Sequence, residues 1–150
     1  MGIIKPFFRT QERQNRLLEV LESWEGTPYR HRSGVKYYGV DCAHFIGCVL
    51  MELGIIESFK VTKYSRDFCL HTSEEGFVAH LREHPLLEEI NINDLMNGDI
   101  LLYKFGRVSG HSAIYFDGDA WQSRSKYGVI KLNCTLDQRR LTNGFRVMER

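Results

Sequence analysis

The sequence lacks several features that would assign it to a specialised class of protein. No apolar run is long enough to span a bilayer, so we expect no membrane span. The formal net charge is only +1, without the basic excess of a nucleic-acid-binding protein, so we expect no nucleic-acid partner. The first residues hold neither an extended apolar stretch nor a small-residue cleavage site, which predicts synthesis in the cytoplasm without a signal peptide.

The four cysteines also lack the spacing of a metal site. None of them forms a C-x-x-C pair, and Cys48, Cys69 and Cys134 are expected to be small buried hydrophobes. Cys42 and His44 form a Cys-x-His pair, but no further ligands follow at a suitable spacing. We therefore expect neither a metal ion nor another cofactor.

The length and the patterning predict one domain with a helical first half and a β second half. At 150 residues the chain is long enough for one substantial core, and residues 1–150 are expected to form a single domain. Apolar periodicity and capping residues predict helices at 11–24, 41–53 and 73–84. The Gly-punctuated segment 29–39 is expected to be a loop.

Alternating or apolar runs predict the strands. They follow the turn signal Asn97-Gly98 and lie at residues 99–105, 111–116, 120–123, 128–132 and 144–148. The predicted fold class is α+β, with N-terminal helices packed on an antiparallel sheet of five or six strands. The core of the domain is expected at about 11–133, with the C-terminal strand at about 144–148.

Cys42 is the most informative residue because it stands where a helix begins. Asp41 can cap that helix, and the positive end of the helix dipole favours the thiolate of a cysteine in the first turn. His111 starts a strand behind Gly110, and a cysteine followed by a distant histidine is the minimum for a thiol hydrolase. The alternative is that both are structural, as a lone cysteine at a helix start or a lone histidine on a strand usually is.

A thiol hydrolase also needs an orienting partner for its imidazole and donors for the oxyanion. A hairpin turn brings Gln122 and Ser123 back beside the strand of His111, and the side-chain oxygen of Gln122 is the preferred partner, with Ser123 as the alternative. The backbone N–H of Cys42 is one candidate donor for the oxyanion, since first-turn N–H groups lack helical partners. The hydroxyl of Tyr29 is a second candidate.

Four segments of the sequence resemble, in the same order, the NlpC-type cysteine peptidases, which are papain-like enzymes that cut bacterial peptidoglycan. The segments are 24–29 (WEGTPY), 39–42 (GVDC), 98–103 (GDILLY) and 111–115 (HSAIY). The match looks closest to the short peptidases of phage tails and phage-derived particles. That finer resemblance lies in 26–31 (GTPYRH), in Arg139-Arg140 and in 144–146 (GFR).

The resemblance implies a small papain-like α+β domain and a peptidase mechanism. It makes Cys42 the nucleophile and His111 the base, with Gln122 at the third polar position and Tyr29 near the oxyanion. The substrate it implies is the stem peptide of peptidoglycan, cut at the γ-D-glutamyl–diaminopimelate bond through a thioester acyl-enzyme. The protein would then act in the periplasm or cell wall, and proteins of a phage tail or similar particle are further expected partners.

Two departures from the family pattern bear on the substrate and on the rate. The small residues Ser-Gly that usually follow Asp-Cys are replaced by Ala43-His44, so His44 is expected to line the substrate site together with Asp41 and Tyr29. The third catalytic residue is most often histidine, whereas Gln122 stands here. An amide oxygen can still accept a hydrogen bond from an imidazole N–H.

Two other functions fit the same residues. The Cys42–His111 pair could serve acyl transfer or deamidation, because one fold hosts several reactions. The chain could also be a catalytically inactive component of a phage tail or secretion device, in which case Cys42 would be no more reactive than Cys48.

Overall fold

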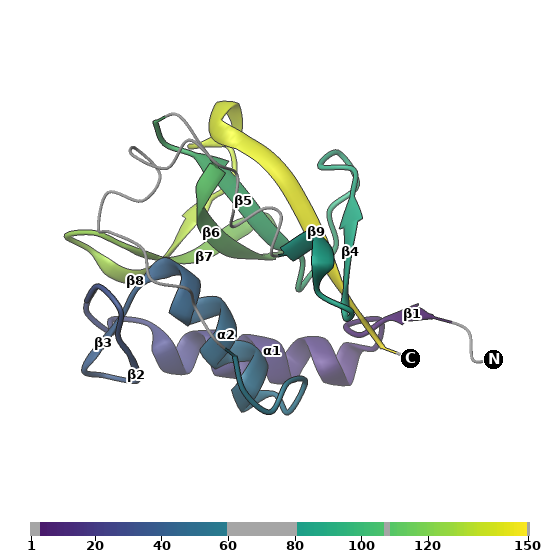
Figure 1. Ribbon diagram of the computed structural model, residues 1–150, viewed down its shortest axis with the longest axis horizontal. Helices are drawn as coiled ribbons and strands as arrows, with labels where there is room; N and C mark the ends of the chain where they lie inside the picture. Colours follow the sequence, from purple (N-terminus) through teal and green to yellow (C-terminus); the bar gives the residue numbers. More distant parts are fainter. Residues whose placement is uncertain (1–3, 60–80, 107–108, 150) are drawn as a thin grey trace.

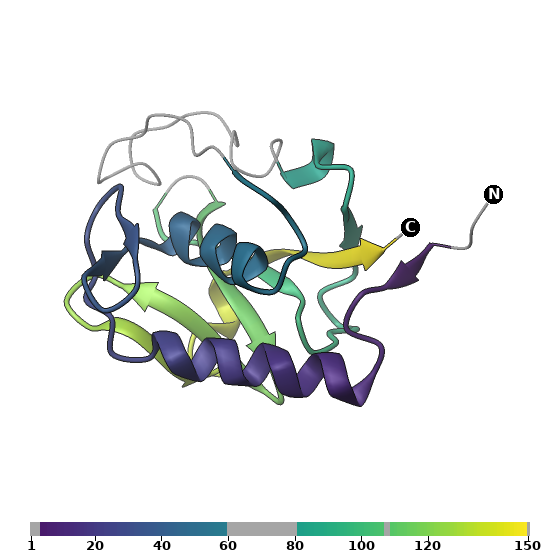
Figure 2. The same ribbon diagram turned by 90° about the horizontal axis from the view of Figure 1, so that it is seen from below.

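Two helices lie on one side of a curved antiparallel sheet (Figures 1 and 2). The computed structural model describes residues 4–59, 81–106 and 109–149. The helices are α1 (Gln11–Trp24) and α2 (Cys42–Glu52), and they confirm the first two predicted helices to within one residue at each end. In the described residues no helix is long and apolar enough to cross a membrane.

The sequence of each helix explains where it starts and what it buries. The side chain of Thr10 caps α1 by accepting a hydrogen bond from the N–H of Arg13 at 3.2 Å. One stripe of α1 is buried, and it consists of Leu17, Val20, Leu21 and Trp24. The helix α2 is capped by Asp41 and is followed by Gly54 at a φ of 73°, a conformation that glycine adopts without strain.

The sheet has seven strands, which is more than the five or six predicted. Its order is β1-β9-β5-β6-β7-β8, with β4 paired to β9. The strands are β1 (Lys5–Pro6), β4 (Leu87–Ile90), β5 (Ile100–Lys104), β6 (Ser109–Phe116), β7 (Asp119–Arg124), β8 (Gly128–Asn133) and β9 (Leu141–Glu149). The α+β class is confirmed. The strands missed are β1 and β4, which are short and have no fully buried residue, so neither shows an apolar run.

Alternation along the strands gives the sheet two apolar faces. One face packs on the helices and includes Ile100, Leu102, Ile114, Phe116 and Trp121. The opposite face carries a smaller cluster of Leu101, Tyr103, Ala113 and Ala120, covered in part by Phe105, Tyr115 and Leu141. His111 and Gln122 have the parity of this second face.

The predicted loop 29–39 contains a short hairpin, formed by β2 (Gly34–Val35) and β3 (Gly39–Val40). The backbone of Tyr29 forms a single bridge with Val40, which brings the loop back to the start of α2. Of the predicted third helix, residues 81–83 are helical, and residues 73–80 lie outside the described residues.

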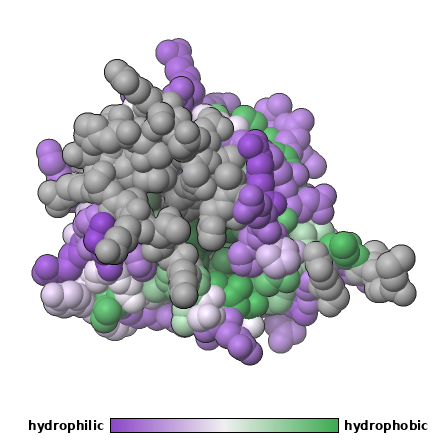
Figure 3. Space-filling view, viewed as in Figure 1, coloured by the Kyte–Doolittle hydropathy of each residue, from purple (hydrophilic) through white to green (hydrophobic). Residues whose placement is uncertain are grey.

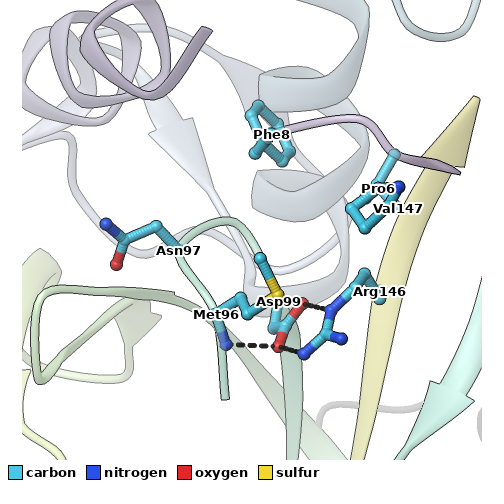
Figure 4. A pocket seen from close by; sticks show the side chains of 7 residues that line it. All are labelled: Pro6, Phe8, Met96, Asn97, Asp99, Arg146 and Val147. Atoms are coloured by element: carbon cyan, nitrogen blue, oxygen red, sulfur yellow. Dashed lines mark hydrogen bonds and ion pairs between the residues drawn. The ribbon is translucent and has the colours of Figure 1, made fainter. Parts of the chain in front are cut away.

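A buried ion pair joins Asp99, which directly precedes β5, to Arg146 in β9 (Figure 4). Asp99 accepts two hydrogen bonds from the guanidinium of Arg146, both at 3.0 Å, and a third from the N–H of Met96 at 2.8 Å. The preceding Gly98 has a φ of 96°. Asp99, Arg146 and Met96 line a small depression that has no room for a ligand, and none of its lining residues belongs to the predicted site.

Candidate active site

Cys42 is the first residue of α2 and lies against the start of strand β6. Its Sγ donates to the carbonyl oxygen of Gly110 at 3.8 Å, which places the thiol beside the residue preceding His111. The structure therefore places Cys42 beside the strand that carries His111. The thiol is partly accessible to solvent, as a group that attacks an external substrate has to be.

Two serines of the sheet hold the backbone on both sides of Asp41. The hydroxyl of Ser112 donates to the carbonyl oxygen of Cys42 at 3.0 Å, and that of Ser123 donates to the carbonyl oxygen of Val40 at 2.6 Å. Both serines are fully buried. The start of α2 is thus fixed to neighbouring strands, so the position of the thiol relative to β6 depends on these two bonds.

The imidazole of His111 is hydrogen-bonded to Gln122. The distance from Nε2 of His111 to Oε1 of Gln122 is 2.7 Å, and Nε2 of Gln122 donates to the carbonyl oxygen of Ala120 at 3.0 Å. Because the second bond orients the amide, its oxygen faces the imidazole and can only accept. Nε2 of His111 therefore carries the proton, and the lone pair of the neutral ring is on Nδ1.

Aromatic rings surround the imidazole and keep it neutral. The ring centre of Phe105 lies 5.3 Å from that of His111 at an interplanar angle of 82°, and Tyr103 lies at 6.0 Å. Burial lowers the pKa of His111 to about 4, the hydrogen bond that the imidazole donates to Gln122 opposes this shift, and the positive charge of Arg124 adds to it. At neutral pH the ring is a proton acceptor.

Asp41 and His44 contact each other at the start of α2. Oδ1 of Asp41 accepts from the backbone N–H of His44 and contacts Nδ1 of the same residue, both at 2.8 Å. Oδ2 accepts from the N–H of Arg32 at 2.8 Å. The carboxylate is completely buried, so its contacts within the described residues hold the helix start and the loop. The ring of His44 packs edge-on against Phe59 at 5.7 Å.

Two of the other cysteines have weakly acidic thiols. Burial, with the nearby carboxylates of Asp41 and Glu52, raises the pKa of Cys48 to about 11. Burial and Asp119 raise the pKa of Cys134 to about 11 as well. Both thiols are protonated at neutral pH.

The sequence analysis missed several residues that build the site. The sequence pattern gives no role to Ser112, which follows His111 directly, and it predicts Tyr103 and Phe105 only as residues of a strand. Two features of the sequence could have indicated them: a polar residue directly follows the histidine, and the predicted strand before it ends in aromatic residues. Within the described residues, no three side chains of the His, Cys, Asp or Glu type are grouped so that they could hold a metal ion.

Solved structures with a similar arrangement of elements include peptidoglycan hydrolases and members of the NLP/P60 family. The NlpC/p60 domain of the peptidoglycan hydrolase SagA aligns with a TM-score of 0.61 and 14% identity, over 87% of this chain and 96% of that domain. The peptidoglycan hydrolase RipB from Mycobacterium tuberculosis aligns with a TM-score of 0.64 and 15% identity, over 97% of this chain and 70% of RipB. The chain has the NlpC/p60 fold.

A third NlpC/p60 structure shows that this fold also occurs within longer chains. A lipoprotein-like member of the NLP/P60 family from Staphylococcus aureus aligns with a TM-score of 0.65 and 17% identity, over 97% of this chain. The alignment spans only 45% of the staphylococcal protein. No protein-family profile and no curated protein sequence matches this chain. The finer resemblance to phage-tail peptidases stays a prediction.

Proposed function

We propose that this protein is a cysteine peptidase that hydrolyses amide bonds in peptidoglycan stem peptides. The observation that carries the proposal is the bond between His111 and Gln122, because it leaves Nδ1 of the imidazole as the proton acceptor at the strand that Cys42 contacts. The position of Cys42 at the first turn of α2 adds the helix dipole, which favours a thiolate.

The proposed reaction passes through an acyl-enzyme. Nδ1 of His111 takes the thiol proton while the sulfur of Cys42 attacks the carbonyl carbon of the substrate amide. The backbone N–H of Cys42 and the hydroxyl of Tyr29 stabilise the oxyanion of the tetrahedral intermediate. His111 then gives its proton to the departing amine. Water, deprotonated by the same imidazole, attacks the thioester and releases the carboxylic acid with the free thiol.

The proposed substrate class rests on the fold and on the earlier resemblance. SagA and RipB are peptidoglycan hydrolases, and both share the NlpC/p60 fold with this chain. The proposed bond is that between γ-D-glutamate and diaminopimelate, which the resemblance to NlpC-type peptidases implies. In this proposal Asp41 holds the start of the helix, and the His44 ring borders the substrate site.

Digestion of purified Gram-negative sacculi tests the proposal. Wild-type protein is compared with Cys42→Ala, and soluble muropeptides are read by mass spectrometry. We expect new fragments cut at one stem-peptide bond with the wild type and none with the variant. Cys48→Ala is the matched control. The Cys48 thiol is protonated at neutral pH, so its removal should leave cleavage unchanged.

The other outcomes contradict the proposal in distinct ways. Fragments extended by an added amine would indicate acyl transfer, and sacculi that bind the protein without release of fragments would indicate an inactive component. Cleavage retained by Cys42→Ala would exclude the thiol mechanism.

A further inference from the structure

Beside His111 lies the ring of Phe105, which also contacts two guanidinium groups. The guanidinium carbon of Arg140 lies 5.0 Å from the ring centre of Phe105, and that of Arg124 lies 5.4 Å from it. The same ring meets the imidazole edge-on at 5.3 Å. The ring of Phe105 therefore contacts the imidazole and both guanidinium groups.

Asp137 organises this cluster but offsets only part of its charge. Its Oδ2 accepts from Nη1 of Arg124 at 2.7 Å, and its carbonyl oxygen accepts from the backbone N–H of Arg140 at 2.8 Å. That second bond closes the 3₁₀ turn Gln138–Arg140, which precedes β9. In the described part of the chain no carboxylate forms an ion pair with Arg140, so two cations face one anion here.

We propose that Arg140, steadied by Phe105, binds a carboxylate on the leaving-group side of the scissile amide. The inference rests on the proposed function, in which the amine that accepts a proton from His111 lies next to the imidazole. Phe105 contacts that imidazole, and Arg140 lies over Phe105. A guanidinium stacked on an aromatic ring presents a planar fork that matches a carboxylate. The preferred substrate has a leaving residue with a free carboxylate, such as diaminopimelate.

Arg124 already forms an ion pair with Asp137, and this pair gives the two arginines different roles. The Arg124–Asp137 pair is partly buried, with 27% and 21% of the side chains exposed, and it fixes one side of the ring. Arg140 is exposed and can reach a ligand without breaking an existing ion pair. If the stacking of Arg140 on Phe105 served only to stabilise the turn, the charge of the leaving residue would not affect the rate at which the substrate is cleaved.

Two peptides that differ only at the leaving residue test the inference. One peptide carries a free carboxylate and the other a carboxamide, and kcat/KM is measured for each. For the wild type we expect a preference of about tenfold for the carboxylate, the size of one charge-assisted contact. In Arg140→Gln the ratio falls towards one, whereas Arg139→Gln, a neighbouring exposed arginine of the same turn, keeps the wild-type ratio.

The possible results separate this inference from the proposed function. An unchanged ratio in Arg140→Gln, or an equal loss in Arg139→Gln, would overturn the role of Arg140. A wild type that cleaves neither peptide would overturn the hydrolysis itself. Calorimetric binding to Cys42→Ala then measures the carboxylate preference without turnover, and equal affinities for the two peptides would refute it.

Discussion

At the scale of single residues, the neutral state of His111 links stability to pH. Its pKa is lowered from 6.5 to about 4 in the folded protein, so between these values the unfolded chain binds a proton that the folded protein does not. The stabilisation from this residue is complete above pH 6.5 and is lost as the pH falls towards 4. A shift of this size corresponds to roughly 3 kcal/mol.

This linkage predicts a pH dependence that a His111 variant lacks. The free energy of unfolding of the wild type, measured in urea between pH 7 and pH 4, should fall by about 2–3 kcal/mol more than that of His111→Gln. Other carboxylates titrate in the same range in both proteins, so the difference between the two curves isolates the imidazole. Parallel curves would show that the imidazole is not held neutral.

Gln122 should position the imidazole of His111, and Ser123 should not. We expect Gln122→Ala to lose about 100-fold in kcat/KM, at the low end of what general acid–base catalysis contributes, because the imidazole loses its fixed tautomer. The acid limb of its pH–rate profile should also move to lower pH, because the Gln122 hydrogen bond raises the pKa of His111. Circular dichroism checks that the variant is folded.

Ser123→Ala provides the comparison for that prediction. Its hydroxyl bonds to the carbonyl oxygen of Val40, so its loss should cost about 1–3 kcal/mol of stability while the pH–rate profile keeps its shape. The reverse pattern, a shifted profile in Ser123→Ala and an unshifted one in Gln122→Ala, would exchange the two roles.

The choice between these two residues is open in the sequence analysis, and the pairing register of β6 and β7 distinguishes their positions. Phe116 pairs with Asp119 across the hairpin, and side chains alternate between faces along each strand. Gln122 therefore shares a face with His111, whereas Ser123 points to the helix face, where it meets the carbonyl oxygen of Val40. What the sequence could not give was the hairpin register on which this argument depends.

At the scale of elements, the well-predicted parts are those with a strong local signal. The helices α1 and α2 have caps and apolar stripes, and β5 to β8 have apolar or alternating runs bounded by turn residues. The strands β1 and β4 depend on pairing with β9, which is distant in sequence. Local patterns carry no information about such pairing.

The glycine in the turn before β5 should be needed for two separate reasons. Gly98 has a φ of 96°, and a Cβ there would lie 2.1 Å from the ring of Phe8. Gly118 has a φ of 86° but has open space at the same position. Backbone strain alone costs about 1–2 kcal/mol, so we expect that cost for Gly118→Ala. Overpacking adds about 1–3 kcal/mol in Gly98→Ala.

Urea unfolding of both variants at pH 7 measures the difference. Because Phe8 is buried in the main core, its ring cannot move aside without disturbing the packing near β9. Equal losses in the two alanine variants would show that backbone conformation alone explains the glycine at 98.

At the scale of the whole molecule, the sheet and its site are held by contacts at opposite ends. Near one end, Ser112 and Ser123 fasten the start of α2 to β6 and β7. At the other end, Asp99 and Arg146 connect the turn before β5 to β9, the strand that also pairs with β1 and β4. In the coloured part of Figure 3, a hydrophobic area lies in the lower part of the view and hydrophilic residues surround it. Buried polar contacts between distant segments therefore add to the hydrophobic core at both ends of the sheet.

Removal of one partner of the buried ion pair should destabilise the protein strongly at neutral pH. Asp99 is 1% exposed, and burial already raises the pKa of its carboxyl despite the bonds from Arg146. In Arg146→Met the carboxylate loses these bonds, so we expect a loss of about 3–5 kcal/mol in the free energy of unfolding at pH 7. Asp99→Asn in the same background removes the buried charge and should restore part of that loss.

The pH dependence of these two proteins identifies the cause of the loss. Burial raises the pKa of Asp99 in the folded state, so the penalty is largest when the carboxyl is charged and shrinks as the pH falls and Asp99 takes up a proton. The deficit of Arg146→Met relative to wild type should therefore diminish at low pH, whereas that of the double variant with Asp99→Asn should stay constant. A deficit in Arg146→Met that does not change with pH would assign the effect to lost packing of the arginine side chain.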